Sequence, residues 1–158
     1  MCGIAGFQGT GSLDDARRMI ARIAYRGPDA QGAVMNGNTA LAHARLSVID
    51  PGQRSDQPMS DEHDELGIVF NGEIYNHLPL REELRRKGHS FSTASDTEVL
   101  LHLYREHGAA MLPKLNGMFA FAIHDRRSGE LFLARDRMGK TPLYYAESPG
   151  TFVFGSAL

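Results

Sequence analysis

The sequence predicts an α+β fold with largely antiparallel sheets. Three observations predict it. Short apolar segments closed by turn residues recur along the chain, helical periodicity is confined to a few segments, and the two kinds come in separate blocks. Strict alternation of strand and helix, which marks a parallel sheet, is absent.

Local signals place each expected element. Asp14 and Asp15 fall in the first turn of a helical pattern, where the helix dipole favours acids, and Asn-Gly-Asn at 36–38 is a hairpin turn. The expected strands cover residues 4–8, 33–35, 39–44, 66–70, 118–123, 130–134, 143–146 and 152–154. The expected helices cover residues 13–24, 80–87 and 96–107, and residues 50–64 form a long polar loop.

Composition limits the classes of function. A chain of 158 residues suits one domain, so we expect residues 1–158 to form a single unit. A net charge of −2 gives no general attraction to nucleic acid or membrane, and no apolar run is long enough for a membrane span. One cysteine and no signal peptide suit the reducing cytoplasm.

The sequence lacks the residue patterns of metal sites, phosphate-binding loops and serine hydrolases. His102 and His107 are five residues apart, on roughly opposite faces of a helix, so we expect no metal site. The Gly-Lys-Thr at 139–141 resembles a phosphate-binding loop, but that loop requires a glycine where Ala134 stands. There is also no Gly-x-Ser-x-Gly for a serine hydrolase.

Cys2 is the candidate nucleophile. If Met1 is removed, Cys2 carries a free α-amine, and amine and thiol both titrate close to neutral pH. The amine then accepts the thiol proton, directly or through one water, so nucleophile and base reside in one residue. The alternative is a small apolar side chain in the first strand, as for most lone cysteines.

Ordered motifs beyond the N-terminal MCGI carry a resemblance. They are RGPD (26–29), AHARLSVID (42–50), FNGEIYN (70–76), ASDTEV (94–99), GMFAFAIHD (117–125) and ARDRMGKTPLYY (134–145). Together they resemble the glutaminase domain of the asparagine synthetase family, the class II glutamine amidotransferases, over essentially the whole chain.

The resemblance implies a four-layer αββα sandwich of the N-terminal-nucleophile hydrolase type. It implies that glutamine is hydrolysed to glutamate and ammonia through a thioester on Cys2. It implies no cofactor for this domain. ATP and Mg belong to a C-terminal synthetase domain, absent from this chain, which is the expected partner and ammonia acceptor; a homodimer is a further expected assembly.

The resemblance also assigns the site. Asn71 and Gly72 would form an oxyanion hole, although Asn-Gly is equally a hairpin signal. Arg45 would bind the substrate carboxylate, with a surface arginine as the alternative. The remaining expected glutamine-binding residues are the main chain of Leu46, Val48 and Ile49, and the acids Glu73 and Asp96 for the ammonium.

Asp96 has a second interpretation, because Ser95 and Glu98 form a capping-box pattern around it. Two other functions stay open. One is an amidase acting on a different small amide. The other is a domain that binds glutamine, or serves as a scaffold, without turnover.

Overall fold

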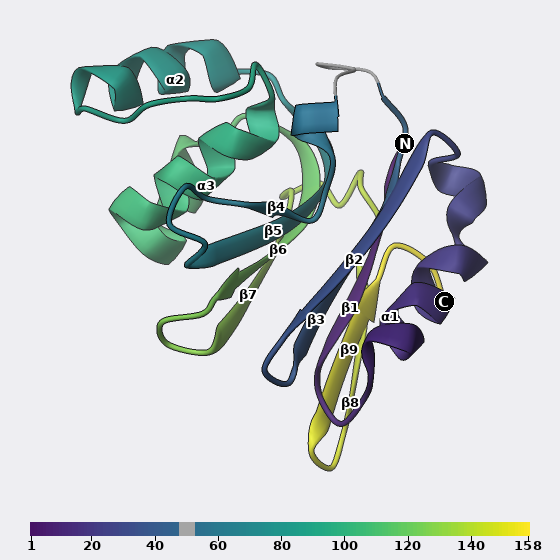
Figure 1. The fold of residues 1–158 in the computed structure, drawn as a ribbon. Helices are drawn as coiled ribbons and strands as arrows, with labels where there is room; N and C mark the ends of the chain where they lie inside the picture. Colours follow the sequence, from purple (N-terminus) through teal and green to yellow (C-terminus); the bar gives the residue numbers. More distant parts are fainter. Residues whose placement is uncertain (48–52) are drawn as a thin grey trace.

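Two antiparallel sheets pack face to face and helices cover their outer faces (Figure 1). The computed structural model describes residues 1–47 and 53–158. The first sheet has the order β2 (Ala30–Asn36), β3 (Thr39–Arg45), β1 (Gly3–Gly9), β9 (Thr151–Gly155), β8 (Tyr144–Ser148). The second has the order β4 (Met59–Ser60), β5 (Leu66–Ile74), β6 (Gly117–Asp125), β7 (Glu130–Arg135).

Three helices complete the four layers. They are α1 (Leu13–Arg22) against the first sheet, and α2 (His77–Arg86) and α3 (Asp96–His107) on the side of the second. Short 3₁₀ turns are η1 (Ala24–Arg26), η2 (Gln53–Ser55) and η3 (Gly108–Lys114). The predicted αββα sandwich is therefore confirmed. Among the described residues, no helix has the length and apolarity needed to cross a membrane.

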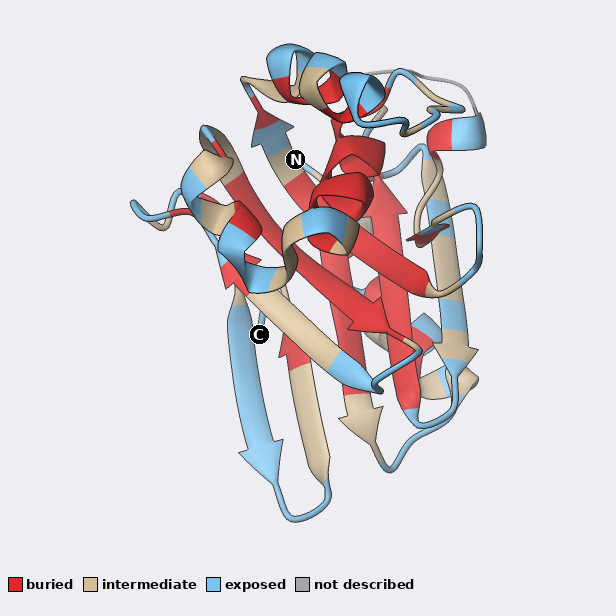
Figure 2. Ribbon diagram, turned by 90° about the vertical axis from the view of Figure 1, so that its left-hand side faces the viewer, coloured by how far each residue is buried: buried red, intermediate tan, exposed pale blue. Residues whose placement is uncertain are grey.

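The period-two alternation of the strands separates the apolar residues into layers. On β3, Ala40, Ala42 and Ala44 pack toward α1, whereas Leu41 belongs to the cluster between the sheets. The buried residues of that central cluster are Ile4, Leu41, Val69, Ala120, Ala122 and Phe154. The largest cluster lies between the second sheet and its helices. In Figure 2, α3 and the central strands are red and β8 is pale blue along its length.

Some elements differ from expectation for local reasons. Helix α2 begins at His77 rather than at residue 80, since Pro79 is tolerated in a first turn. Ser95 does cap α3, but it accepts from the Thr97 N–H, and Glu98 accepts instead from the N–H groups of Ser92 and Thr93. The predicted capping box at α3 is therefore wrong. A complete capping box does occur at α1, between Ser12 and Asp15.

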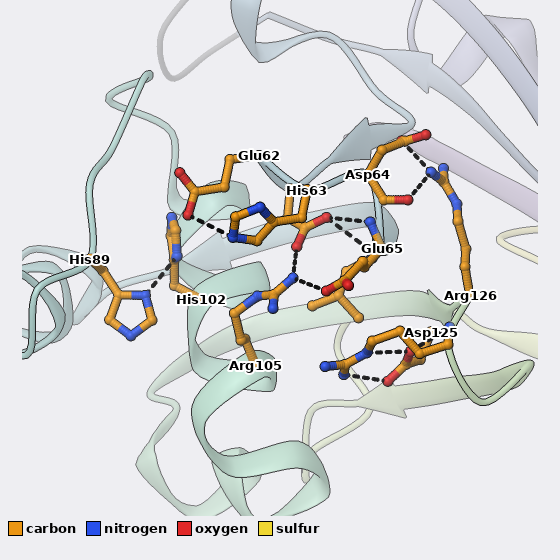
Figure 3. A network of polar contacts seen from close by, with 12 residues as sticks. Glu62, His63, Asp64, Glu65, His89, His102, Arg105, Asp125 and Arg126 are labelled. Carbon is orange, nitrogen blue, oxygen red and sulfur yellow. Dashed lines mark hydrogen bonds and ion pairs between the residues drawn. The ribbon is translucent and has the colours of Figure 1, made fainter.

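The polar loop expected over residues 50–64 also contains structure. Its described part holds η2 and the two-residue strand β4. A network of ion pairs fixes the turn after β4 against α3 and β6 (Figure 3). Arg105 of α3 contacts both Asp61 and Glu65, at 2.8 Å for the latter, and Arg126 contacts Asp64. These ion pairs hold the turn that joins β4 to β5, although β4 itself has only two residues.

The connection between β7 and β8 folds around one carboxylate. Asp136 is 7% exposed and accepts four backbone N–H groups, at 3.0–3.2 Å, from Phe119 in β6 and from Met138, Lys140 and Thr141. Arg135 adds a hydrogen bond from Nε to the Thr141 carbonyl at 2.6 Å. This loop is therefore tied to β6 beside the strand pair β5–β6.

We expect Asp136→Ala to lower the free energy of unfolding by about 2–4 kcal/mol, because it leaves several backbone donors without their acceptor. Urea unfolding measures this loss. Asp14→Ala, which removes an exposed ion pair with Arg17, is the control and should change little. Equal stabilities of the two variants would contradict the structural role of the Asp136 carboxylate.

Candidate active site

A cavity of about 220 Å³ opens where the start of β1 meets β5 and the N-terminus of α3. Seven residues expected in the site line it: Cys2, Arg45, Leu46, Asn71, Gly72, Glu73 and Asp96. Val48 and Ile49 lie outside the described residues. Segments separated by almost a hundred positions thus converge on one hollow, although the role of each residue stays a prediction.

Hydrogen bonds hold both the side chain and the backbone of Cys2. The Leu46 N–H donates to its Sγ at 3.3 Å, and Arg26 Nε donates to its carbonyl at 3.1 Å. Its neighbour Gly3 packs closely on η1 and the residue before it, since an added Cβ would lie 3.0 Å from Ile23 Cδ1 and require that side chain to shift. The sulfur therefore has a defined place at the cavity wall.

Strand β5 runs straight through Asn71 and Gly72 to Ile74. The hairpin-turn alternative for this Asn-Gly pair is therefore wrong. Gly72 has φ of +147°, and an added Cβ would lie 2.1 Å from the Met118 carbonyl oxygen in β6. Glycine is required here because the two strand backbones approach closely in a conformation that side chains disfavour.

One edge of β5 is mostly uncovered in the described part of the chain. Strand β4 covers it only at Gly67 and Ile68. Beyond them, the Phe70 N–H donates to Gln57 Oε1 at 2.6 Å, and the Ile74 N–H donates to Asp96 Oδ2 at 3.0 Å. Backbone groups alternate between the two edges of a strand, so the N–H of Gly72 faces the same edge, where the cavity lies.

Asn71 supplies a second polar group. It is 1% exposed, and neither Oδ1 nor Nδ2 has a hydrogen-bond partner among residues 1–47 and 53–158. A buried amide without partners costs roughly 1–3 kcal/mol per group, so its retention calls for a function. The Asn71 side chain and the Gly72 N–H are thus two potential donors at the cavity, and their role as an oxyanion hole stays a prediction.

Charged groups complete the lining. Arg45 is 5% exposed and its Nη1 pairs with Asp56, so the surface-arginine alternative is wrong. Burial raises the pKa of Asp96, although the hydrogen bond from the Ile74 N–H and the neighbouring His77 oppose the shift. Glu73 is exposed at the rim. A guanidinium and two carboxylates therefore line the same cavity, a pattern suited to a zwitterion.

Sequence reasoning missed two residues beside this cavity. Gln57 lines it and binds Phe70, and His43 Nε2 lies 3.1 Å from the Phe70 carbonyl oxygen. His43 belongs to the motif AHARLSVID (42–50), which assigns it no role, and Gln57 lies in the segment expected to be a loop. Neither contact has a local signal, because each depends on which segments come together in the fold.

We expect Gly72→Ala to lower the free energy of unfolding by more than roughly 2 kcal/mol, because strain at positive φ adds to the clash with Met118. Gly37→Ala is the matched control: Gly37 also has positive φ, but nothing lies within 4 Å of an added Cβ. Urea unfolding compares them. Equal losses would show that the close approach to β6 is not limiting.

Comparisons with known proteins agree with this geometry. A family model described as a glutamine amidotransferase domain matches residues 1–158. The asparagine synthetase [glutamine-hydrolyzing] of Sandersonia aurantiaca is 43% identical over 91% of this chain, and asparagine synthetase [glutamine-hydrolyzing] 3 of Bacillus subtilis is 40% identical over all of it. The chain spans only 28% and 27% of these relatives.

Among solved structures, the glutamine phosphoribosylpyrophosphate amidotransferase of B. subtilis, complexed with ADP and GMP, superposes with a TM-score of 0.85. The match covers 98% of this chain and 42% of that one at 24% identity, so it bears on the fold alone. It agrees with the predicted αββα sandwich. The family is shown by the sequence matches: the chain belongs to the glutamine amidotransferase domain family, as its ordered motifs predict.

Proposed function

We propose that this domain hydrolyses the side-chain amide of glutamine to glutamate and ammonia, with Cys2 as the nucleophile. The observation that carries the proposal is the buried amide of Asn71, unpaired among the described residues, in the cavity that also holds Cys2. An oxyanion hole needs donors that are fixed before the substrate arrives, and Asn71 and the Gly72 N–H are proposed to supply them.

The proposed reaction has two steps, formation of a thioester on Cys2 and its hydrolysis. Cys2 Sγ attacks the amide carbon, the carbonyl oxygen becomes an oxyanion held by Asn71 Nδ2 and the Gly72 N–H, and the C–N bond breaks. Ammonia leaves with the former thiol proton, and a thioester remains. Water then attacks the thioester, the C–S bond breaks, and glutamate departs as the thiol regains a proton. The α-amine of Cys2 transfers the protons.

Removal of Met1 is part of this proposal. While Met1 is attached, the nitrogen of Cys2 belongs to a peptide bond and has no basic lone pair. Met1 also lines the cavity, so it takes space beside the sulfur. Its loss would create the base and enlarge the site in one step.

The substrate's own charges have candidate partners. Arg45 is proposed to bind the α-carboxylate, and Asp96 with Glu73 the α-ammonium. The raised pKa of Asp96 supports this, because a bound cation would stabilise its ionised form. The main chain of Leu46, Val48 and Ile49 is proposed to complete the pocket.

The fate of the ammonia is also a proposal. The named relatives are asparagine synthetases, and this chain spans 28% and 27% of their lengths, which supports an acceptor domain following this one. We propose that the acceptor domain is ATP-dependent and that the protein is cytoplasmic. This domain itself is proposed to need no cofactor, with ATP and Mg bound only by the acceptor domain. A homodimer remains a prediction.

We expect Cys2→Ala to abolish glutamate release from glutamine in protein whose Met1 has been removed, because no other group supplies the sulfur nucleophile. Glutamate release is measured directly, and the intact mass establishes whether Met1 is present. Cys2→Ala with wild-type turnover would overturn the assignment. Wild-type protein that has lost Met1 and binds glutamine without hydrolysing it would instead support a non-catalytic domain.

We expect Asp96→Asn to raise the KM for glutamine by roughly tenfold to a hundredfold, because it removes the charge facing the ammonium. The pKa of Asp96 is raised on folding, so the folded carboxyl still holds its proton at pH values where the unfolded one has released it. Its contribution to stability therefore falls as pH rises through the folded pKa.

The variant should consequently be at least as stable as the wild type at pH 7, with the Asn amide oxygen still able to accept the Ile74 N–H. Thermal unfolding across pH 4–7 tests this half, and Asp14→Asn is the exposed control. An unchanged KM together with lower stability at pH 7 would assign Asp96 a purely structural role.

A further inference from the structure

Two side chains take the place of a missing strand partner at Phe70. On the edge of β5 beyond β4, the Phe70 N–H donates to Gln57 Oε1 at 2.6 Å, and the Phe70 carbonyl accepts from His43 Nε2 at 3.1 Å. A carbonyl oxygen only accepts, so Nε2 of His43 carries the proton. Both polar groups of this backbone residue are therefore satisfied by side chains from other segments.

His43 makes its contact across the sandwich. It lies on β3 of the first sheet, is 1% exposed, and reaches the backbone of β5 in the second sheet. Burial lowers its pKa to about 4, so the ring is neutral at physiological pH. Its Nδ1 is buried without a hydrogen-bond partner within the described residues. An apolar residue would avoid that unpaired nitrogen, so packing alone does not account for a histidine here.

The peptide that His43 holds leads directly into the proposed oxyanion hole. The Phe70 carbonyl and the Asn71 nitrogen belong to one planar peptide unit, so fixing the oxygen fixes the backbone from which the Asn71 side chain starts. Gly72 follows, at the unusual φ of +147°. Gln57 fixes the same residue from its N–H side and extends Nε2 to Thr97 Oγ1, 3.3 Å away, next to Asp96.

We infer that His43 and Gln57 are positioning residues for the oxyanion hole, an inference that rests on the proposed glutamine hydrolysis. They hold Phe70 so that the Asn71 amide and the Gly72 N–H point into the cavity before the substrate binds. Neither needs to touch glutamine. Their effect belongs to the chemical step, because misplacement of a catalytic donor by about 1 Å costs roughly a hundredfold in rate.

The central test compares His43→Met, which removes the donor, with His43→Gln, whose amide can replace Nε2–H. We expect His43→Met to lower kcat at saturating glutamine by roughly tenfold to a hundredfold with KM within about threefold, and His43→Gln to recover most of kcat. His124→Met is the matched control. His124 is also a buried histidine, but it lies on β6 opposite Gly67, away from the cavity, and its loss should leave kcat unchanged.

A second readout separates the oxyanion hole from the nucleophile. Iodoacetamide alkylates Cys2 when the sulfur attacks its methylene carbon and iodide leaves, a reaction that forms no oxyanion. Alkylation rate, and its protection by glutamine, should be the same in His43→Met and wild type. Slowed alkylation, lost protection, or an unchanged kcat in folded His43→Met would each overturn the inference.

Gln57→Met keeps the test decisive if His43→Met does not fold. A fall in kcat with normal alkylation supports the inference, and an unchanged kcat contradicts it. Failure of the proposed function itself is distinct, since wild-type protein freed of Met1 would then show no glutamate release at all. Thermal unfolding of every variant confirms that the compared proteins are folded.

Discussion

The edge of β5 that the described residues leave mostly uncovered is the constraint on which the rest of the site depends. A strand edge inside a protein presents backbone donors and acceptors that must find partners, and β4 covers only two residues of this one. The fold satisfies Phe70 and Ile74 with side chains from other segments and leaves Gly72, between them, facing a cavity. Incomplete pairing thus leaves a backbone donor at the cavity, where the proposed oxyanion hole would use it.

Two features of the site oppose the stability of the fold. Asn71 is buried with both amide atoms unpaired in the described part of the chain, and burial opposes ionisation of Asp96. The second sheet and its helices offset this cost, because β5 and β6 pair over nine positions and pack on α3. Under the proposed function, the substrate's carbonyl oxygen would pair with the Asn71 amide and its ammonium would stabilise ionised Asp96. The same two groups would then favour both substrate binding and the geometry needed for reaction.

The sequence predicts much of this arrangement, but it does so unevenly. Periodicity predicts the strands, the helices and their order, because side-chain burial follows a local repeat. The ordered motifs predict the residues that line the cavity. Local signals mislead where tertiary context decides: Asn71-Gly72 has the composition of a hairpin turn yet lies within β5, because the pairing with β6 continues to Ile74. His43 and Gln57 act on Phe70 through contacts that no local pattern encodes.

The position of the single cysteine follows from the same geometry. Gly3 pairs with Ala44, so Cys2 continues the register opposite Arg45, and the Leu46 N–H reaches its sulfur. A cysteine further along β1 would place its sulfur within the packed layers, since Ile4 and Phe7 are buried there. Nor could an interior residue offer an α-amine. Under the proposed hydrolysis, Cys2 combines a sulfur at the cavity wall with a nitrogen that would become a base on removal of Met1.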